Sequence, residues 1–280
     1  MPDQILLAEA DGVATMVLNR PEKLNAFDDA MRAEFLAAID ALAARTDVRV
    51  LVITGAGRAF SAGGDVGYMV RLKQAEADYE GGLGTLVAAG ATAIAHIEAL
   101  PFPTLACVNG AAAGGGCNLA LACDLRIASD RAAFGQSFVK IGMHTDWGGS
   151  YYLPRLVGLS KALELCWLGD MVDAHEALRI GLVNRVVPHE TLEAETRALA
   201  MRLASAPQTS VRVAKRNLRA GLARPLDACL DAEYQAQAAC WASADSGEGV
   251  RAFVEKRGPH FGRPFPDETA APSPAARRFE

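Results

Sequence analysis

The chain of 280 residues has no concentration of basic charge, few histidines and few aromatic residues. Its 28 Lys and Arg residues are outnumbered by 33 Asp and Glu residues, which gives a net charge of −5 and favours neither nucleic acid nor an anionic membrane as a partner. The five histidines show no HxxxH or His-carboxylate spacing, so no metal site is expected. A hydrophobic content of 51% with only 22% charged residues excludes intrinsic disorder and a coiled coil.

The six cysteines form no CxxC motif and no disulfide framework, which predicts free thiols in a reducing cytosol and a cytoplasmic protein. The first residues lack the basic segment of a signal peptide, so none is expected. The stretch 99–123 carries no charge and is long enough to cross a bilayer. Because it contains Pro101, Pro103 and three consecutive glycines, it is predicted to fold as strand, turn and helix inside a core, not as a membrane span.

Strand and helix patterns alternate through the first part of the chain. Apolar runs rich in β-branched residues and bounded by Gly, Pro or Asn predict strands at 13–19, 48–54, 104–109 and 124–129. Between the first two, 28–44 has apolar residues at helical spacing. The alternation predicts an α/β fold with a largely buried sheet.

Helical patterns dominate after Ser160, which is expected to cap the first of these helices. Asp173 and Glu176 form a capping box, and Gly181 is expected to end that helix. The remaining expected elements are a strand at 182–187 and helices at 191–205, 208–222, 226–243 and 248–257.

These patterns divide the chain into three predicted regions. An α/β core covers 1–195, and a C-terminal helical region covers 196–261. The tail 262–280 is rich in proline and alanine without an apolar period, which predicts disorder.

Two glycine-rich loops each follow a predicted strand: AFSAGGDV at 59–66 and NGAAAGGGCN at 109–118. Bare backbone amides in such loops allow close approach of a ligand, and two loops converging on one oxygen would form an oxyanion hole. The alternative is that the glycines only permit tight turns and close packing. Neither loop is a phosphate-binding P-loop, because no GK[ST] follows.

These loops, with four further segments in a fixed order, resemble the crotonase (enoyl-CoA hydratase/isomerase) superfamily over residues 5–261. The stretches that carry the resemblance are AFSAGGDV, PTLACVNGAAAGGGCNLALACDLRIAS, AAFGQ, DWGGSYYLPRLVG, EALRIGLVNRVVP and AFVEKRGPHF. The resemblance implies a spiral of ββα units with a C-terminal helical layer that forms trimers, often paired into hexamers. It also implies acyl-CoA thioester substrates of fatty acid metabolism and enolate chemistry without a metal or redox cofactor, coenzyme A entering as part of the substrate.

The resemblance also assigns roles to individual residues. The oxyanion-hole amides would be those of Gly64 and Gly115. Residues that would bind coenzyme A or line the substrate site are Lys23, Ala26, Ser61, Ala62, Gly63, Asp65, Val66, Asn118, Phe138, His144 and Lys256. Three of them carry a second interpretation: Asp65 as an anchor of its loop, His144 as a bystander, and Lys256 as an ordinary solvated charge.

Two residues depart from the pattern of the family's hydratases, which carry glutamates where this chain has Asn118 and Phe138. Water addition needs one group to take a proton from water and another to deliver a proton to carbon, and neither residue does so. Asp146 matches the position of the catalytic aspartate of some isomerases and a dehalogenase of the family. Trp147 flanks it, and the resemblance implies that Phe138 lies nearby, so the pKa of Asp146 is expected to be raised. The alternative is that Asp146 caps the following helix.

The resulting hypothesis is an enoyl-CoA isomerase in which Asp146 moves a proton from the carbon beside the thioester carbonyl to another carbon. The alternatives are an enoyl-CoA hydratase that uses Asp146 with another group, and a coenzyme A-binding protein without catalysis. Residues 67–92 are expected to form helix, glycine break and helix, which the resemblance places along the acyl pocket.

Overall fold

The structure, a computed structural model, describes residues 3–76 and 78–262. These residues divide into two compact units, one ending at Ala204 and the other beginning at Ser205. Within these ranges no helix has the length and apolar character needed to cross a membrane. The predicted tail 262–280 lies, apart from Gly262, outside the described residues.

The larger sheet of the first unit has six strands in the order β1-β2-β3-β5-β7-β10, with β1 antiparallel to β2 and the other pairs parallel. The strands are β1 (Ile5–Ala10), β2 (Val13–Leu18), β3 (Val50–Gly55), β5 (Thr104–Val108), β7 (Leu125–Ser129) and β10 (Arg185–Val187). All but β1 were predicted. The prediction missed β1 because ILLAEA has one β-branched residue and is mostly exposed at the sheet edge.

A smaller sheet has four strands of three residues each, in the order β4-β6-β8-β9. They are β4 (Ala59–Ser61), β6 (Ala111–Ala113), β8 (Ala133–Gly135) and β9 (Met171–Asp173). Strands β3, β5 and β7 of the larger sheet are each followed by a strand of the smaller sheet and then by helix, which is the ββα repeat. Three alanine-rich residues are too few for a periodic pattern, so this sheet was missed in the sequence.

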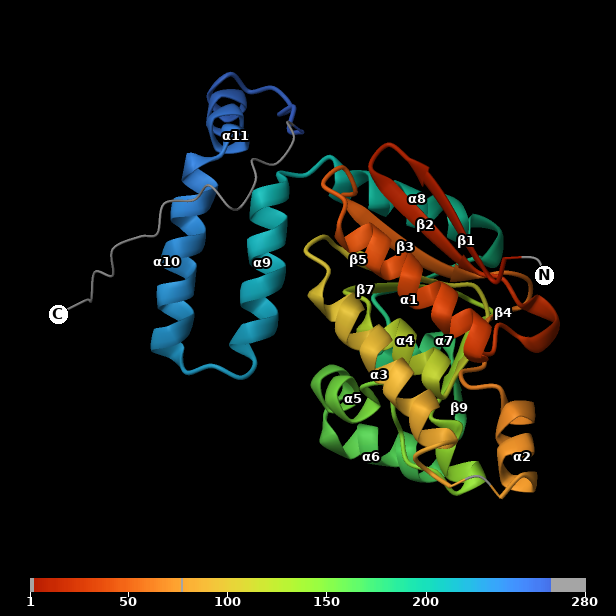
Figure 1. Cartoon of the computed structure of the whole chain (residues 1–280). Helices are drawn as coiled ribbons and strands as arrows, with labels where there is room; N and C mark the ends of the chain where they lie inside the picture. The colour runs from red at the N-terminus through yellow and green to blue at the C-terminus, as the bar shows by residue number, and fades with distance from the viewer. Residues whose placement is uncertain (1–2, 77, 263–280) are drawn as a thin grey trace. The chain divides into compact units, whose positions relative to one another are not determined.

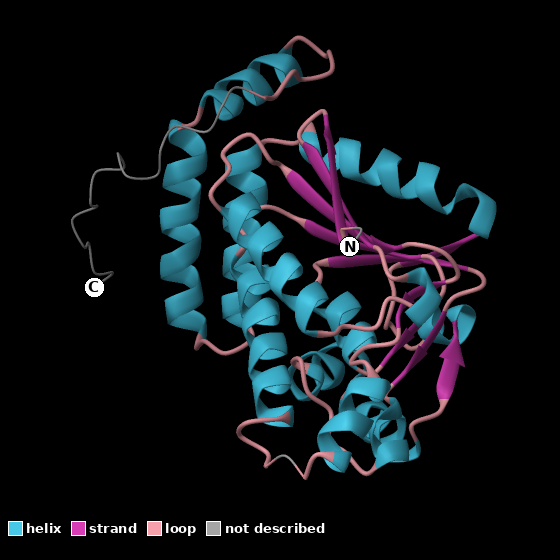
Figure 2. Ribbon diagram, turned by 45° about the vertical axis from the view of Figure 1, so that its right-hand side comes forward, coloured by secondary structure: helices cyan, strands magenta, loops and turns pink. Residues whose placement is uncertain are grey.

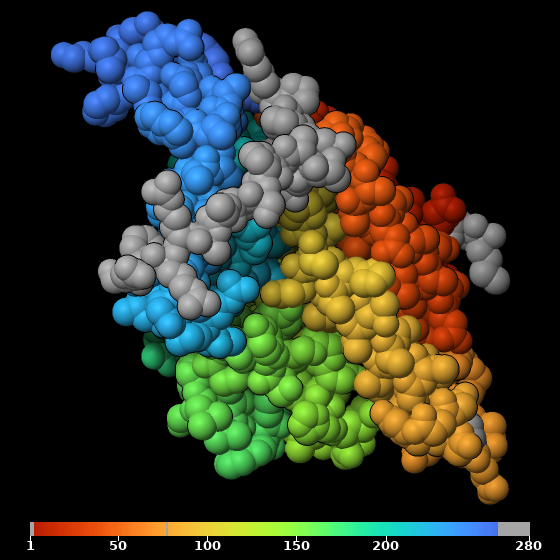
Figure 3. Space-filling model, turned by 60° about the vertical axis from the view of Figure 1, so that its left-hand side comes forward, coloured from red at the N-terminus to blue at the C-terminus, as the bar shows by residue number. Residues whose placement is uncertain are grey.

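Helices fill the connections of the first unit (Figures 1 and 2). They are α1 (Asp29–Ala43), α2 (Val66–Gln74), α3 (Leu83–Ala99), α4 (Gly115–Ala122), α5 (Gly149–Val157), α6 (Leu159–Leu168), α7 (Ala174–Arg179) and α8 (Leu192–Ala204), with short 3-10 turns at η1 (Pro21–Lys23), η2 (Ser137–Ile141) and η3 (His189–Thr191). Helices α1 and α3 lie side by side on one surface of this unit (Figure 3).

The helix caps test two sequence predictions. Asp173 accepts a hydrogen bond from the Glu176 backbone N–H at 2.8 Å, so the predicted cap of α7 is confirmed. The predicted cap at Ser160 is wrong, because α6 begins at Leu159 after Gly158. Gly158 has φ +77°, a conformation that favours glycine, and it supplies the turn between α5 and α6.

The central strands of the larger sheet, β2, β3, β5 and β7, are largely buried, as predicted. Alternate side chains of each strand point to opposite sides, so both faces of these strands contribute to the core. In β3, Leu51 and Ile53 join the core cluster that includes α1, α3 and α4. Val50 and Val52 join a second cluster against α8, on the opposite face (Figure 1). The first compact unit therefore extends past the expected boundary at 195, to the end of α8.

The second unit contains α9 (Gln208–Gly221), α10 (Leu226–Ala242) and α11 (Ala244–Val254). Pro207 and Pro225 stand immediately before α9 and α10, as the sequence suggested. Helix α11 begins earlier than predicted, because the Ser243 hydroxyl accepts a hydrogen bond from the Ser246 backbone N–H at 3.2 Å and caps it.

Candidate active site

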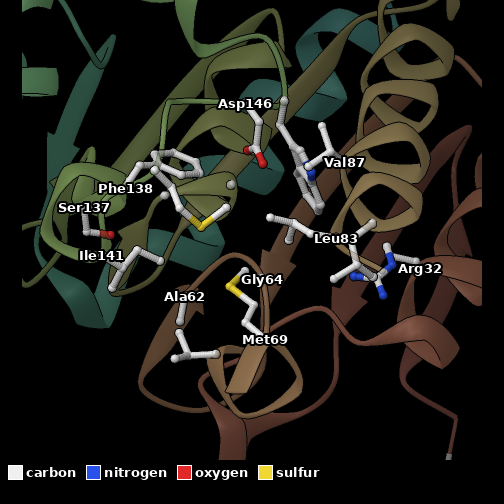
Figure 4. Close-up of a pocket in the computed structure, with 16 residues that line it drawn as sticks. Arg32, Ala62, Gly64, Met69, Leu83, Val87, Ser137, Phe138, Ile141 and Asp146 are labelled. Atoms are coloured by element: carbon white, nitrogen blue, oxygen red, sulfur yellow. The ribbon is translucent and has the colours of Figure 1, made fainter. Parts of the chain in front are cut away.

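A cavity of about 70 Å³ opens in the first unit between the glycine loops, helices α2 and α3, and the segment from η2 to α5 (Figure 4). Most of its wall is apolar. Its lining residues are Arg32, Ala62, Gly64, Val66, Met69, Leu83, Leu86, Val87, Gly114, Gly115, Ser137, Phe138, Ile141, Met143, Asp146 and Trp147. Six of the residues expected at the site are among them, namely Ala62, Gly64, Val66, Gly115, Phe138 and Asp146.

The two glycine loops meet at this cavity because strands β4 and β6, from which they emerge, pair in parallel. Gly63 has φ +84°, and a Cβ added there would lie 2.8 Å from the backbone nitrogen of Gly115. A Cβ at Gly116 would lie 2.2 Å from the carbonyl oxygen of Ser61. The backbones therefore touch, and only glycine fits at both positions.

Gly64 and Gly115 both line the cavity, and each has a backbone N–H group. Neither donates a hydrogen bond to any other residue within the described ranges. Gly115 is also the first residue of α4, where unpaired N–H groups and the helix dipole favour negative charge. This arrangement can hold an oxyanion.

Asp146 lies in the loop between η2 and α5, and its carboxyl points into the cavity opposite Gly64 and Ala62 (Figure 4). Burial raises the pKa of Asp146 to about 6, although its own backbone N–H and nearby His144 oppose the rise. The carboxyl Oδ1 is buried and has no hydrogen-bond partner in the part of the chain that the structure describes. The alternative of a helix cap is wrong, because Gly148 occupies the N-cap of α5 and no side chain caps that helix.

Trp147 forms an aromatic wall next to this carboxyl. It has φ +47°, and its ring packs edge-on to Phe27 with centroids 5.0 Å apart. Gly90 of α3 makes room for the indole, because a Cβ there would lie 1.6 Å from Trp147 Nε1. A Cβ at Gly115 would lie 3.3 Å from the same ring. The indole thus lies against the Gly115 loop as well as beside Asp146.

Two residues near the cavity were missed in the sequence: Gly90, which makes room for the indole, and Arg32, which lines the cavity. A glycine in the middle of a helix was the available signal for Gly90. Arg32 of α1 is buried, donates to the Phe27 carbonyl oxygen at 3.3 Å and forms an ion pair with Asp29. The sequence signal for Arg32 was a charged residue on the apolar face of this helix, three residues before Phe35.

Three other expected residues shape the loop before α2. The Ser61 hydroxyl donates to the Asn25 carbonyl oxygen at 2.8 Å and accepts from the Gly63 N–H at 3.1 Å. Asp65 caps α2 and pairs with Arg20 at 3.3 Å, so it anchors its loop. Burial alone would raise the pKa of Asp65, but the Tyr68 N–H and Arg20 together hold it below its ordinary value.

The remaining expected residues do not line this cavity. Asn118 is fully buried, and its side chain forms hydrogen bonds with Thr145, Asp146 and Gln136. His144 lines a second cavity of about 320 Å³ between η2, α5 and α6. Lys23 is exposed in η1, and Ala26, three residues further along the chain, is buried. Lys256 is exposed beyond the end of α11, in the second unit.

The fold is a spiral of ββα units, and its cavity combines a partly buried carboxyl with two amides that have no hydrogen-bond partner among the described residues. This combination suits an enzyme that stabilises an oxyanion and moves a proton. The enoyl-CoA hydratase/isomerase family model matches residues 8–264. The chain therefore belongs to this family, the crotonase superfamily, and is an acyl-CoA enzyme.

Relatives and solved structures agree with this assignment. The chain is 39% identical to crotonyl-CoA hydratase of Syntrophomonas wolfei, over 92% of this chain and 98% of the relative. It is 37% identical to 1,2-epoxyphenylacetyl-CoA isomerase of Escherichia coli, over 93% and 99% respectively. The crystal structure of enoyl-CoA hydratase from Bacillus anthracis superposes with a TM-score of 0.86 at 34% identity, covering 92% of this chain and 98% of that one. Most of the related proteins are named as hydratases.

Proposed function

We propose that the protein is an enoyl-CoA isomerase that moves a double bond along the acyl chain of its substrate by a 1,3 proton shift. The Asp146 carboxylate takes a proton from the carbon beside the thioester carbonyl. The electron pair of that C–H bond moves toward the thioester oxygen, whose negative charge the Gly64 and Gly115 N–H groups stabilise. Asp146 then returns the same proton two carbons further on, so the atoms of substrate and product balance.

The observation that carries this proposal is the Asp146 carboxyl itself. It is partly buried, its Oδ1 has no hydrogen-bond partner among residues 3–76 and 78–262, and it lines the same cavity as Gly64 and Gly115. A pKa of about 6 suits a group that must both accept and release a proton near neutral pH. One such carboxyl is sufficient for a proton shift.

Hydration is the second candidate, because most of the named relatives are hydratases. It needs two proton-transfer groups, whereas Asp146 is the only carboxyl among the described residues that line the cavity. Phe138 adds an apolar ring to the same wall. These observations favour isomerisation over water addition, and the free amides beside Asp146 favour catalysis over binding of coenzyme A alone.

Ultraviolet absorbance with two substrates separates these functions. A 3-enoyl-CoA should gain the absorbance of a conjugated thioester if the protein is an isomerase. A 2-enoyl-CoA should lose that absorbance if the protein is a hydratase. Unchanged absorbance with both substrates, together with binding measured by calorimetry, would indicate a protein that binds coenzyme A without catalysis.

We also propose, from the family resemblance, that the protein acts in the cytoplasm as a homo-trimer or hexamer and uses no metal or redox cofactor. Light scattering coupled to size-exclusion chromatography tests the assembly. Turnover that survives dialysis against a chelator would agree with the metal-free mechanism, and turnover restored only by an added metal would contradict it.

A further inference from the structure

Three side chains form a closed ring of hydrogen bonds behind Asp146: Asn118 of α4, Gln136 after β8, and Thr145. Asn118 Nδ2 donates to Thr145 Oγ1 at 3.0 Å, and Thr145 Oγ1 donates to Gln136 Oε1 at 3.0 Å. Gln136 Nε2 closes the ring by donating to Asn118 Oδ1 at 2.8 Å. We call these three residues the Asn118 ring.

The backbone of Asp146 sets the direction of every bond in the Asn118 ring. Asn118 Nδ2 also donates to the Asp146 carbonyl oxygen at 2.7 Å, and a carbonyl oxygen only accepts. The Asn118 atom nearest to it must therefore be the amide nitrogen. Asn118 Oδ1 is then left to accept from Gln136, which leaves Gln136 Oε1 to accept from Thr145.

The Asn118 ring holds the Asp146 backbone in place because the ring packs tightly against the start of α5. A Cβ added at Gly149 would lie 2.1 Å from Thr145 Oγ1 and 2.6 Å from Asn118 Nδ2. The Gly149 N–H donates to the same Asp146 carbonyl oxygen at 2.9 Å. That oxygen is thus held from two sides, and both Asn118 and Gln136 are buried.

The Asp146 side chain is less constrained than its backbone. Its Oδ1 has no hydrogen-bond partner within the described ranges, so none of the side chains described there fixes that oxygen over the cavity. The orientation of the carboxyl consequently depends on the backbone from which it projects. A displacement of about 1 Å in a reacting group can cost about 100-fold in rate.

We infer that Asn118 is a positioning residue, which acts through the Asn118 ring to hold Asp146 at the place where it meets the substrate. The role requires an amide: Nδ2 supplies two donors, one for Thr145 and one for the Asp146 carbonyl, while Oδ1 accepts from Gln136. An ionised carboxylate at this position would offer only acceptors to the carbonyl oxygen. This inference rests on the proposed function of Asp146.

Thr145→Val tests the inference, because it removes one hydroxyl from the ring and nearly keeps the side-chain shape. We expect kcat for the double-bond shift to fall by about 10- to 100-fold, with KM changed by less than about threefold. Thr145→Ser restores the hydroxyl and should bring kcat back to within about threefold of the wild type. Asn118→Leu removes both donors and should lower kcat by about 100-fold or more; if it does not fold, the Thr145 pair carries the test.

Thr104→Val is the matched control. Thr104 is a buried threonine of β5 that exchanges hydrogen bonds of 3.0 and 2.9 Å with Asp124 and lines neither cavity. We expect it to lower the unfolding temperature and leave kcat unchanged. An equal loss of kcat in Thr104→Val and Thr145→Val would overturn the inference, because loss of any buried hydrogen bond would then have the same effect.

Asp146→Asn separates this inference from the proposed function. In that background Thr145→Val should cause no further loss, because the ring acts through Asp146. A further loss of kcat in the double variant would overturn the positioning role alone. The same conclusion would follow if Thr145→Val kept the wild-type kcat while Asp146→Asn was inactive. Wild-type turnover by Asp146→Asn itself would overturn the proposed function and this role with it.

Discussion

Replacing Asp146 by Asn should make the protein less active and more stable at the same time. Burial raises the pKa of Asp146 to about 6, against an ordinary value of 3.8. A difference of one in pKa corresponds to about 1.36 kcal/mol. Ionising this carboxyl therefore costs the folded state about 3 kcal/mol more than it costs the unfolded chain. Solvent that reaches the exposed part of the carboxyl reduces the expected value to about 2 kcal/mol.

The sign follows from proton linkage. Because the folded pKa lies above the unfolded one, the folded chain holds this proton more tightly. Its stabilising contribution is fully present below pH 3.8 and is lost as the pH rises through about 6. Asn is neutral at every pH, so the gain from Asp146→Asn should be largest at pH 8 and roughly half as large at pH 5.

Thermal unfolding at a fixed protein concentration measures this gain. At about 2–4 °C for each kcal/mol, the midpoint should rise by about 4–8 °C at pH 8. The rate of isomerisation should fall by about 100-fold or more, because positioned acid–base groups contribute roughly 10²–10⁴. Exchange of deuterium from solvent into the substrate α-carbon should be lost together with the rate.

Asp170→Asn is the matched control, because Asp170 is a carboxylate with 73% of its side chain exposed in a surface pair with Lys140. Its midpoint should change little and its activity should not change. The reasoning is refuted if Asp146→Asn keeps its turnover, or if its midpoint equals that of the wild type at pH 8.

Three further substitutions test the walls of the site. Gly115→Pro removes a proposed oxyanion donor at the first position of α4, where proline is tolerated, and should lower the rate of isomerisation by about 10²–10³. Gly115→Ala is the control, because it keeps the N–H group and should lose far less activity. Equal rates in the two variants would show that this amide takes no part in the mechanism. Gly90→Ala would place a methyl group where the indole of Trp147 lies, and should lower the free energy of unfolding by about 1–3 kcal/mol or more. Gly247→Ala, in an open position of α11, is the control and should be neutral or stabilising. Denaturant unfolding compares the two variants, and equal stabilities would contradict the close packing of Gly90 against Trp147. Asp65→Ala removes the cap of α2 and should cost about 1 kcal/mol, which a wild-type unfolding curve would contradict.

The sequence by itself determined most elements of the larger sheet and most of the helices. Runs of β-branched residues and helical spacing are local signals, and they persist because both faces of the sheet are buried. The cap at Asp173 and the stop at Gly181 are equally local, since they depend on residues a few positions apart. The glycine loops and Asp146 were also identified from the sequence, with more than one role left open for each.

Only the tertiary structure showed which of these residues lie together. Gly63 and Gly115 lie far apart in the chain and touch because β4 and β6 pair, through strands too short to leave a periodic pattern. Asp146 has the local sequence of a cap, but the turn at Gly148 takes the N-cap and leaves the carboxyl facing the cavity. Asn118 was expected at the substrate site and does not line the cavity. Its hydrogen-bond partners follow β8 or precede α5, and only the packing of the chain brings these segments to α4.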